Sequence, residues 1–148
     1  MLRGRQTSTW ALAVTLGLSG CGDDGPEPEP AWCEIPADEV LPGEVMELQS
    51  YGVPLGELCA GSMAAAERHA LWVGERWGRA PEHFDYLLYD SQDEGCWPCS
   101  DGAGACTNSK GVHAPRFPHR HEIAHAVRPR GCYRFIEEGW ATLYGDPF

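Results

Sequence analysis

Residues 121–125 read His-Glu-Ile-Ala-His, with two histidines four positions apart. In a helix, four residues advance the chain by roughly 400°, so both imidazoles leave one face, one turn apart. That spacing suits two nitrogen ligands of a single Zn²⁺, each at about 2.0–2.1 Å. Glu122 is rotated about 100° from His121, which makes it a poor third ligand in the same cluster. It is instead a candidate general base for a water molecule on the metal.

The sequence around this motif predicts where its helix begins and ends. Pro118 fits the first turn of a helix, and Pro129 cannot continue one, so we expect a helix over about 118–127. A second helix is expected over about 135–144, where the composition is helical despite Gly139. Whether a third ligand follows the two histidines decides between a metal site and a chance pattern.

The second expected helix begins with Phe-Ile-Glu-Glu-Gly-Trp-Ala at 135–141. An H-E-x-x-H helix followed by a helix with an E-G-x-A segment resembles the gluzincin branch of zinc metallopeptidases. The resemblance implies zinc-dependent hydrolysis of a peptide or protein substrate. It also implies that Glu138, directly before the glycine, is the third zinc ligand beside His121 and His125, and that Glu122 is the catalytic residue.

The residues around Glu138 lead to two further predictions about how the helices meet. Glu137 lies about 100° away around a helix, so only one of the two glutamates should face the metal. The small residues Gly139 and Ala141 should let the two helices approach closely. Twelve residues separate His125 from Glu138, fewer than in many gluzincins, so the connection between the helices must turn tightly.

Other branches of zinc peptidases fit the sequence less well. A metzincin would need glycine at position 128 and histidine at 131, where this chain has Arg128 and Gly131. An aspartate-liganded site could recruit only Asp146, which has no supporting pattern. Larger gluzincins continue into a C-terminal subdomain that is missing here, which leaves a minimal member or a truncated reading frame as interpretations.

Residues 1–20 are expected to be an export signal. Arg3 and Arg5 are basic, and residues 10–18 are apolar but too few to cross a bilayer. Leu-Ser-Gly-Cys at 18–21 resembles the lipobox of bacterial lipoproteins, which implies cleavage before Cys21 and acylation of its thiol. The alternatives are an ordinary signal peptide with a chance cysteine, or a buried apolar helix.

The next segment, 21–32, is acidic and rich in proline, so we expect it to be an extended tether. The folded domain is then expected over 33–148. The lipobox resemblance places it outside the cytoplasm, anchored by lipid to a bacterial membrane, on the periplasmic face or at the cell surface. The chain has 22 acidic and 11 basic side chains, a formal net charge of −11, which argues against nucleic acid as a partner.

The chain contains seven cysteines, and six remain if Cys21 carries lipid. An even number in a small exported domain is typical of a disulfide framework, although the sequence does not determine the pairing. A second zinc site or a redox pair is the alternative for 96–106. The disulfide candidates are Cys33, Cys59, Cys96, Cys99, Cys106 and Cys132.

The remaining patterns predict an α+β fold with a small sheet. Ser62 can cap a helix that runs to about Trp77, with Ala66, Ala70 and Val73 on the same side as Trp77. Residues 84–89 favour a strand, 96–111 a loop, and 111–114 a short edge strand. With the backing helix at 62–77, the motif helix and the glutamate helix, this is a minimal, disulfide-stapled zincin-like domain.

Three further side chains are candidates for stabilising an oxyanion: His113, Tyr133 and Tyr144. Ordinary packing is the alternative for each. The rival function is a non-catalytic envelope lipoprotein, whose zinc site is structural or vestigial and whose surface binds another envelope component. An open fourth coordination position would favour the enzyme, and a closed site with four protein ligands would favour the rival.

Overall fold

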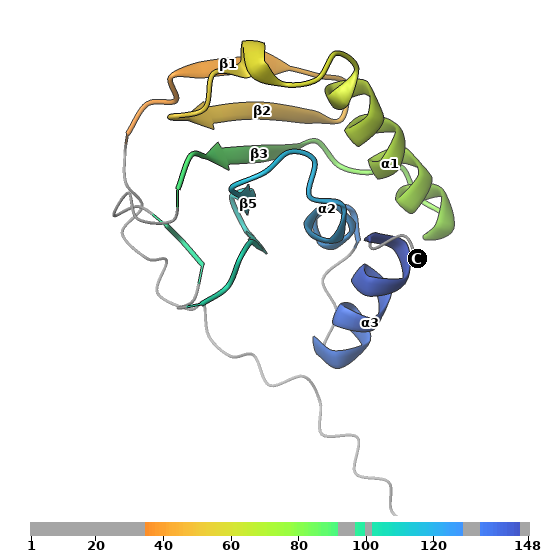
Figure 1. Cartoon of the computed structure of the whole chain (residues 1–148). Helices are drawn as coiled ribbons and strands as arrows, with labels where there is room; N and C mark the ends of the chain where they lie inside the picture. Colours follow the sequence, from red (N-terminus) through yellow and green to blue (C-terminus); the bar gives the residue numbers. More distant parts are fainter. Residues whose placement is uncertain (1–34, 92–96, 100–101, 129–133, 146–148) are drawn as a thin grey trace, which may run out of the picture.

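The computed structural model describes residues 35–91, 97–99, 102–128 and 134–145. They form a mixed five-stranded sheet with three α-helices and one 3₁₀ helix, which confirms the α+β class (Figure 1). In chain order the elements are β1 (Glu39–Pro42), β2 (Met46–Tyr51), η1 (Leu55–Glu57), α1 (Ser62–Arg76), β3 (Phe84–Tyr89), β4 (Cys106–Asn108), β5 (Gly111–Ala114), α2 (Arg120–Val127) and α3 (Arg134–Gly145).

The strands are arranged in the order β1-β2-β3-β5-β4. The three central strands are parallel, and each edge strand is antiparallel to its neighbour. Leu48 lies opposite Tyr86, and Leu88 lies opposite Ala114. Because side chains alternate along a strand, these four share one face of the sheet, and all four are buried.

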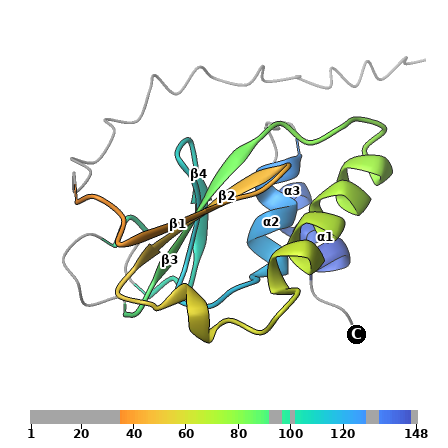
Figure 2. The ribbon, with the colours of Figure 1, turned by 90° about the horizontal axis from the view of Figure 1, so that it is seen from above.

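All three α-helices lie on this side of the sheet, and α3 packs against α2 (Figure 2). The motif helix α2 contacts α1, α3, β4 and β5, so it lies at the centre of the domain. Removal of the apolar helix faces from water supplies the main stabilisation of the fold. The helical residues of the core are Ala66, Ala70, Val73, Ile123, Ala124, Val127 and Ala141.

The backing helix matches its prediction closely. α1 buries Ala66, Ala70 and Val73, as its periodicity predicts. The capping prediction was wrong: Ser62 is the first helical residue, and Gly61 is the N-cap. Gly61 has φ of +87°, a left-handed conformation that glycine adopts without steric cost, so it turns the chain into the helix.

The strands predicted at 84–89 and 111–114 are confirmed as β3 and β5. Two details of the predicted sheet were wrong. β5 is not an edge strand, however, because β4 pairs with its outer side. β4 itself lies within 96–111, the segment predicted as a loop.

The structure contains a disulfide bond between Cys99 and Cys106. Cys59 was expected to be paired and is instead an exposed free cysteine between η1 and α1. Within the described residues its potential partners are Cys99 and Cys106, and they are bonded to each other. Four cysteines lie outside the described residues: Cys21, Cys33, Cys96 and Cys132.

The predicted signal segment 1–20 and tether 21–32 also lie outside the part of the chain that the structure describes. Among the described helices, none combines the length and apolar character that a bilayer crossing requires.

Candidate metal site

The helix that carries the His-Glu-Ile-Ala-His motif begins at Arg120 and is fixed by a buried tyrosine. The Tyr86 hydroxyl on β3 donates to the carbonyl oxygen of Arg116 at 2.6 Å. The same hydroxyl accepts the backbone N–H of His119, the N-cap residue, at 2.9 Å. Burial raises the pKa of Tyr86, so its hydroxyl keeps the proton that it donates.

Two sides of the helix α2 carry different kinds of side chain. Ile123 and Val127 point into the core, as expected for residues four apart. His121 and His125 lie on another side and are both half-buried. The helix ends at Val127, and Arg128 is extended, the conformation favoured before the proline at 129.

The helix α3 packs closely against α2 through small residues. Glu138, Ala141 and Gly145 are three and four residues apart, so they form one stripe along α3. Ala141 is fully buried, as expected. A Cβ atom built on Gly145 would lie 2.3 Å from the Cα atom of His121. Gly139, expected at this contact, instead has open space where a Cβ would stand, because it lies on a different side of α3.

The two helices bring His121, His125 and Glu138 together, and this group could hold a metal ion. The Nε2 atoms of His121 and His125 are 3.2 Å apart. Oε2 of Glu138 lies 3.4 Å from Nε2 of His121 and 3.5 Å from Nε2 of His125. In a tetrahedral zinc site with ligands at about 2.0–2.1 Å, neighbouring ligand atoms are about 3.3–3.4 Å apart. The three donor atoms therefore match one face of such a tetrahedron.

The site is buried on the α2 side and open on the α3 side. The His121 and His125 side chains are 18% and 12% exposed, whereas that of Glu138 is 52% exposed. Burial lowers the pKa of His125, against the opposing effect of the nearby Glu122 and Glu138 carboxylates. The neutral imidazole, which is the form that binds metal, is therefore favoured at His125.

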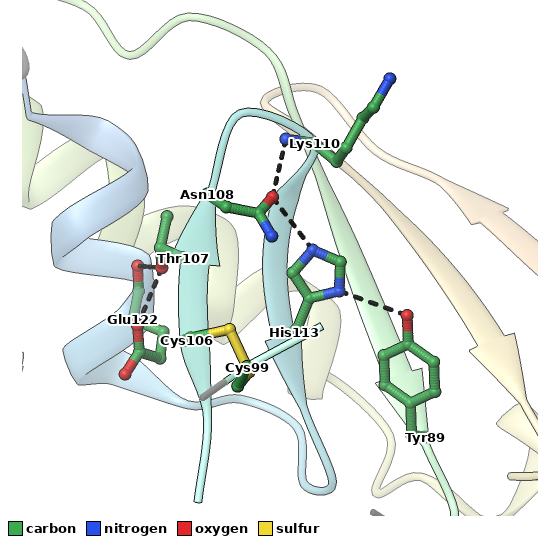
Figure 3. The surroundings of a disulfide bond; sticks show 8 residues. All are labelled: Tyr89, Cys99, Cys106, Thr107, Asn108, Lys110, His113 and Glu122. Atoms are coloured by element: carbon green, nitrogen blue, oxygen red, sulfur yellow. Dashed lines mark hydrogen bonds between the residues drawn. A yellow bond between two sulfur atoms is a disulfide. The ribbon is translucent and has the colours of Figure 1, made fainter. Parts of the chain in front are cut away.

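Glu122 is buried and is not a member of the three-residue group. The Thr107 hydroxyl on β4 lies 2.9 Å from Oε2 of Glu122 and 3.0 Å from the backbone oxygen of Glu122 (Figure 3). The sequence prediction missed Thr107 because it placed this residue in a loop. The only signal available was the β-branched side chain, which favours a strand.

A second interaction that the sequence prediction missed separates the two adjacent glutamates. Oε2 of Glu137 lies 2.5 Å from the Arg128 guanidinium, and their side chains are only 17% and 10% exposed. Glu138 lies beside the two histidines instead. The expectation that only one of these glutamates faces the histidines is therefore confirmed.

His113, a candidate for oxyanion stabilisation, lies on the other face of the sheet. Its ring is fully buried, with Nδ1 3.2 Å from the Tyr89 hydroxyl and Nε2 3.1 Å from Oδ1 of Asn108 (Figure 3). Strand alternation explains the position, because Val112 and Ala114 point toward the helices and His113 between them points away. Burial lowers the pKa of His113 to about 4. The oxyanion assignment for His113 was therefore wrong.

The other two oxyanion candidates are Tyr144 and Tyr133. The Tyr144 ring stacks on Trp140 and contacts the edge of Trp72, with ring centroids 4.9 Å and 5.4 Å apart. These contacts match the packing alternative for Tyr144. Tyr133 lies outside the described residues.

Comparison with protein-family models, curated proteins and solved structures found no match to this chain. The chemistry of the site therefore follows from its own residues. They are two imidazoles and a carboxylate that face a common point, beside a buried glutamate that does not join them.

Proposed function

We propose that this protein is a zinc-dependent peptidase in which His121, His125 and Glu138 bind the metal and Glu122 is the general base. The observation that carries the proposal is the triangle of donor atoms, with sides of 3.2, 3.4 and 3.5 Å. Two histidines and one glutamate are a donor set of catalytic zinc sites, which leave the fourth position to water or substrate. The gluzincin resemblance of the sequence supports the same ligand assignment.

The number of ligands favours the enzyme over the non-catalytic alternative. Within the described residues, the group of potential ligands has three members, whereas structural zinc sites almost always have four protein ligands. The exposed side chain of Glu138 also keeps this carboxylate accessible from solvent. Both features support a site that admits a substrate.

The proposed mechanism uses Glu122 as a proton carrier. Zn²⁺ held by His121, His125 and Glu138 would lower the pKa of a bound water toward neutrality and would polarise a carbonyl group. The Glu122 carboxylate takes a proton from the attacking water as the new C–O bond forms at the peptide carbon. It then delivers this proton to the amine nitrogen as the C–N bond breaks, which leaves a carboxylic acid and an amine. Burial of Glu122 strengthens its interactions with the reacting groups.

The substitution Glu122→Gln tests this function most sharply, because it removes the base and keeps the shape of the side chain. We expect the zinc-loaded protein to cleave members of a peptide library, and a chelator to stop the cleavage until zinc is restored. Glu122→Gln should lower kcat at least about 100-fold while zinc stays bound. Glu75→Gln, an exposed change on α1, is the control. Full activity of Glu122→Gln would refute the catalytic assignment, and an inactive, fully zinc-loaded wild type would favour the envelope lipoprotein.

We also propose that the protein is exported and attached to a bacterial membrane through lipid on Cys21, with 21–32 as the tether. The support is the order of basic, apolar and lipobox-like segments in the sequence. The change Cys21→Ser should release the protein from the membrane fraction of the producing cells. Unchanged membrane association of that variant would contradict the anchor.

A further inference from the structure

Glu122 is the one acidic side chain that is buried among the residues the structure describes, at 8% exposure. A buried carboxylate must be satisfied by hydrogen bonds, since it has lost its water. Thr107 supplies such a bond: its hydroxyl donates to Oε2 of Glu122 at 2.9 Å and also lies 3.0 Å from the backbone oxygen of the same residue. The bond joins one oxygen of the Glu122 carboxylate to β4.

Thr107 is itself held by its neighbours on β4. Cys106 is bonded to Cys99, and the Asn108 side chain is bonded to the buried ring of His113. These neighbours point to the face of the sheet away from the helices, so Thr107 between them points toward α2 (Figure 3). The strand therefore presents the hydroxyl to Glu122 from a fixed backbone.

We propose that Thr107 is a positioning residue for the hydrolysis, acting through Glu122; this inference rests on the proposed function. Because Oε2 accepts the Thr107 hydroxyl, Oε1 is the oxygen left to take the proton of the attacking water. Proton transfer requires the base within hydrogen-bond reach of that water, and a small misplacement is costly. A carboxylate without the Thr107 bond would sample orientations in which neither oxygen is in place.

Two substitutions separate this role from packing. Thr107→Val keeps the branched shape and removes the hydroxyl, whereas Thr107→Ser keeps the hydroxyl and removes the methyl group. Each full-length variant is loaded with zinc, and its kcat, KM and zinc affinity are measured against a peptide that the wild type cleaves. We expect Thr107→Val to lower kcat about 10- to 100-fold, with KM and zinc affinity within about twofold of wild type. Thr107→Ser should retain kcat within about threefold.

The outcomes distinguish this inference from the function on which it rests. A wild-type protein that binds zinc and cleaves no peptide would overturn both. Cleavage by the wild type with an unchanged kcat in Thr107→Val would overturn the role of Thr107 alone. A parallel loss of zinc affinity in that variant would also overturn it, because Thr107 would then support the whole helix. If Thr107→Val does not fold, Thr107→Ala carries the same expectation.

Discussion

The backbone of Gly145, at the end of α3, lies directly against the backbone of His121 in α2. A Cβ atom at Gly145 would stand 2.3 Å from the Cα atom and 2.6 Å from the nitrogen of His121, both of which are backbone atoms that cannot turn aside. No side chain fits between the helices at this point. The separation that presents Glu138 to the two histidines therefore depends on a glycine.

Replacing Gly145 with alanine should move α3 away from α2. We expect Gly145→Ala to destabilise the protein by about 1–3 kcal/mol and to weaken zinc binding about tenfold. Thermal unfolding and a zinc titration against a competing chelator measure the two effects.

Gly139 provides the matched control, because a Cβ there would meet no atom within 4 Å. Gly139→Ala should leave zinc affinity unchanged and stabilise the helix by about 0.5–1 kcal/mol, since alanine favours helix over glycine. A stabilising effect of Gly145→Ala as well would show that the two helices do not meet as described.

The ion pair between Arg128 and Glu137 should strengthen zinc affinity, although neither residue belongs to the proposed metal site. It joins the residue after α2 to the first turn of α3, next to Glu138. We expect Glu137→Gln to weaken zinc binding about tenfold, in the range found for groups that orient a metal ligand. Glu138→Gln, which removes the carboxylate of the proposed ligand, should have a larger effect, and Glu75→Gln should have none. Equal effects of the changes at 137 and 138 would show that the two glutamates share the metal.

The buried His113 should make the metal-free protein less stable in acid. Its pKa is lowered from 6.5 to about 4 by burial, so the unfolded chain takes up the proton first as the pH falls. The unfolded state then binds more protons than the folded state between about pH 6.5 and 4, and the free energy of unfolding falls across that window. The full effect of His113 amounts to about 3 kcal/mol.

Burial also lowers the pKa of His69 and His125, so the contribution of His113 must be obtained by difference. Urea unfolding of the metal-free protein at a series of pH values, for the wild type and His113→Gln, measures it. The variant should show a shallower loss of stability between pH 6.5 and 4. The same dependence of stability on pH in both proteins would show that folding does not lower the pKa of His113.

The sequence predicted the helices and strands whose conformation depends mainly on residues near one another in the chain. The helical spacing of Ala66, Ala70 and Val73 predicted α1, aromatic residues predicted β3, and flanking prolines predicted α2 to within two residues. The group of His121, His125 and Glu138 was also predictable, because the two histidines share one helix and the resemblance named the glutamate.

The parts that sequence did not predict depend on pairing between distant segments. β4 has only three residues, and its strand conformation depends on its pairing with β5. Thr107 therefore could not be connected to Glu122, which is 15 positions away in the chain. His113 was misplaced for the same reason, because the face to which it points is decided by the position of β5 in the sheet. Gly145 and Gly139 could not be told apart until the stripe of α3 that meets α2 was known.

Metal binding by His121, His125 and Glu138 is the central claim, and elemental analysis with a zinc titration tests it most directly. The purified wild type, exposed to zinc and freed of excess, should retain one zinc ion per chain. His125→Ala should lose that ion and bind zinc at least about 100-fold more weakly, because one of three ligands is gone. A wild type that retains no zinc, or a His125→Ala variant that retains one ion per chain, would contradict the account.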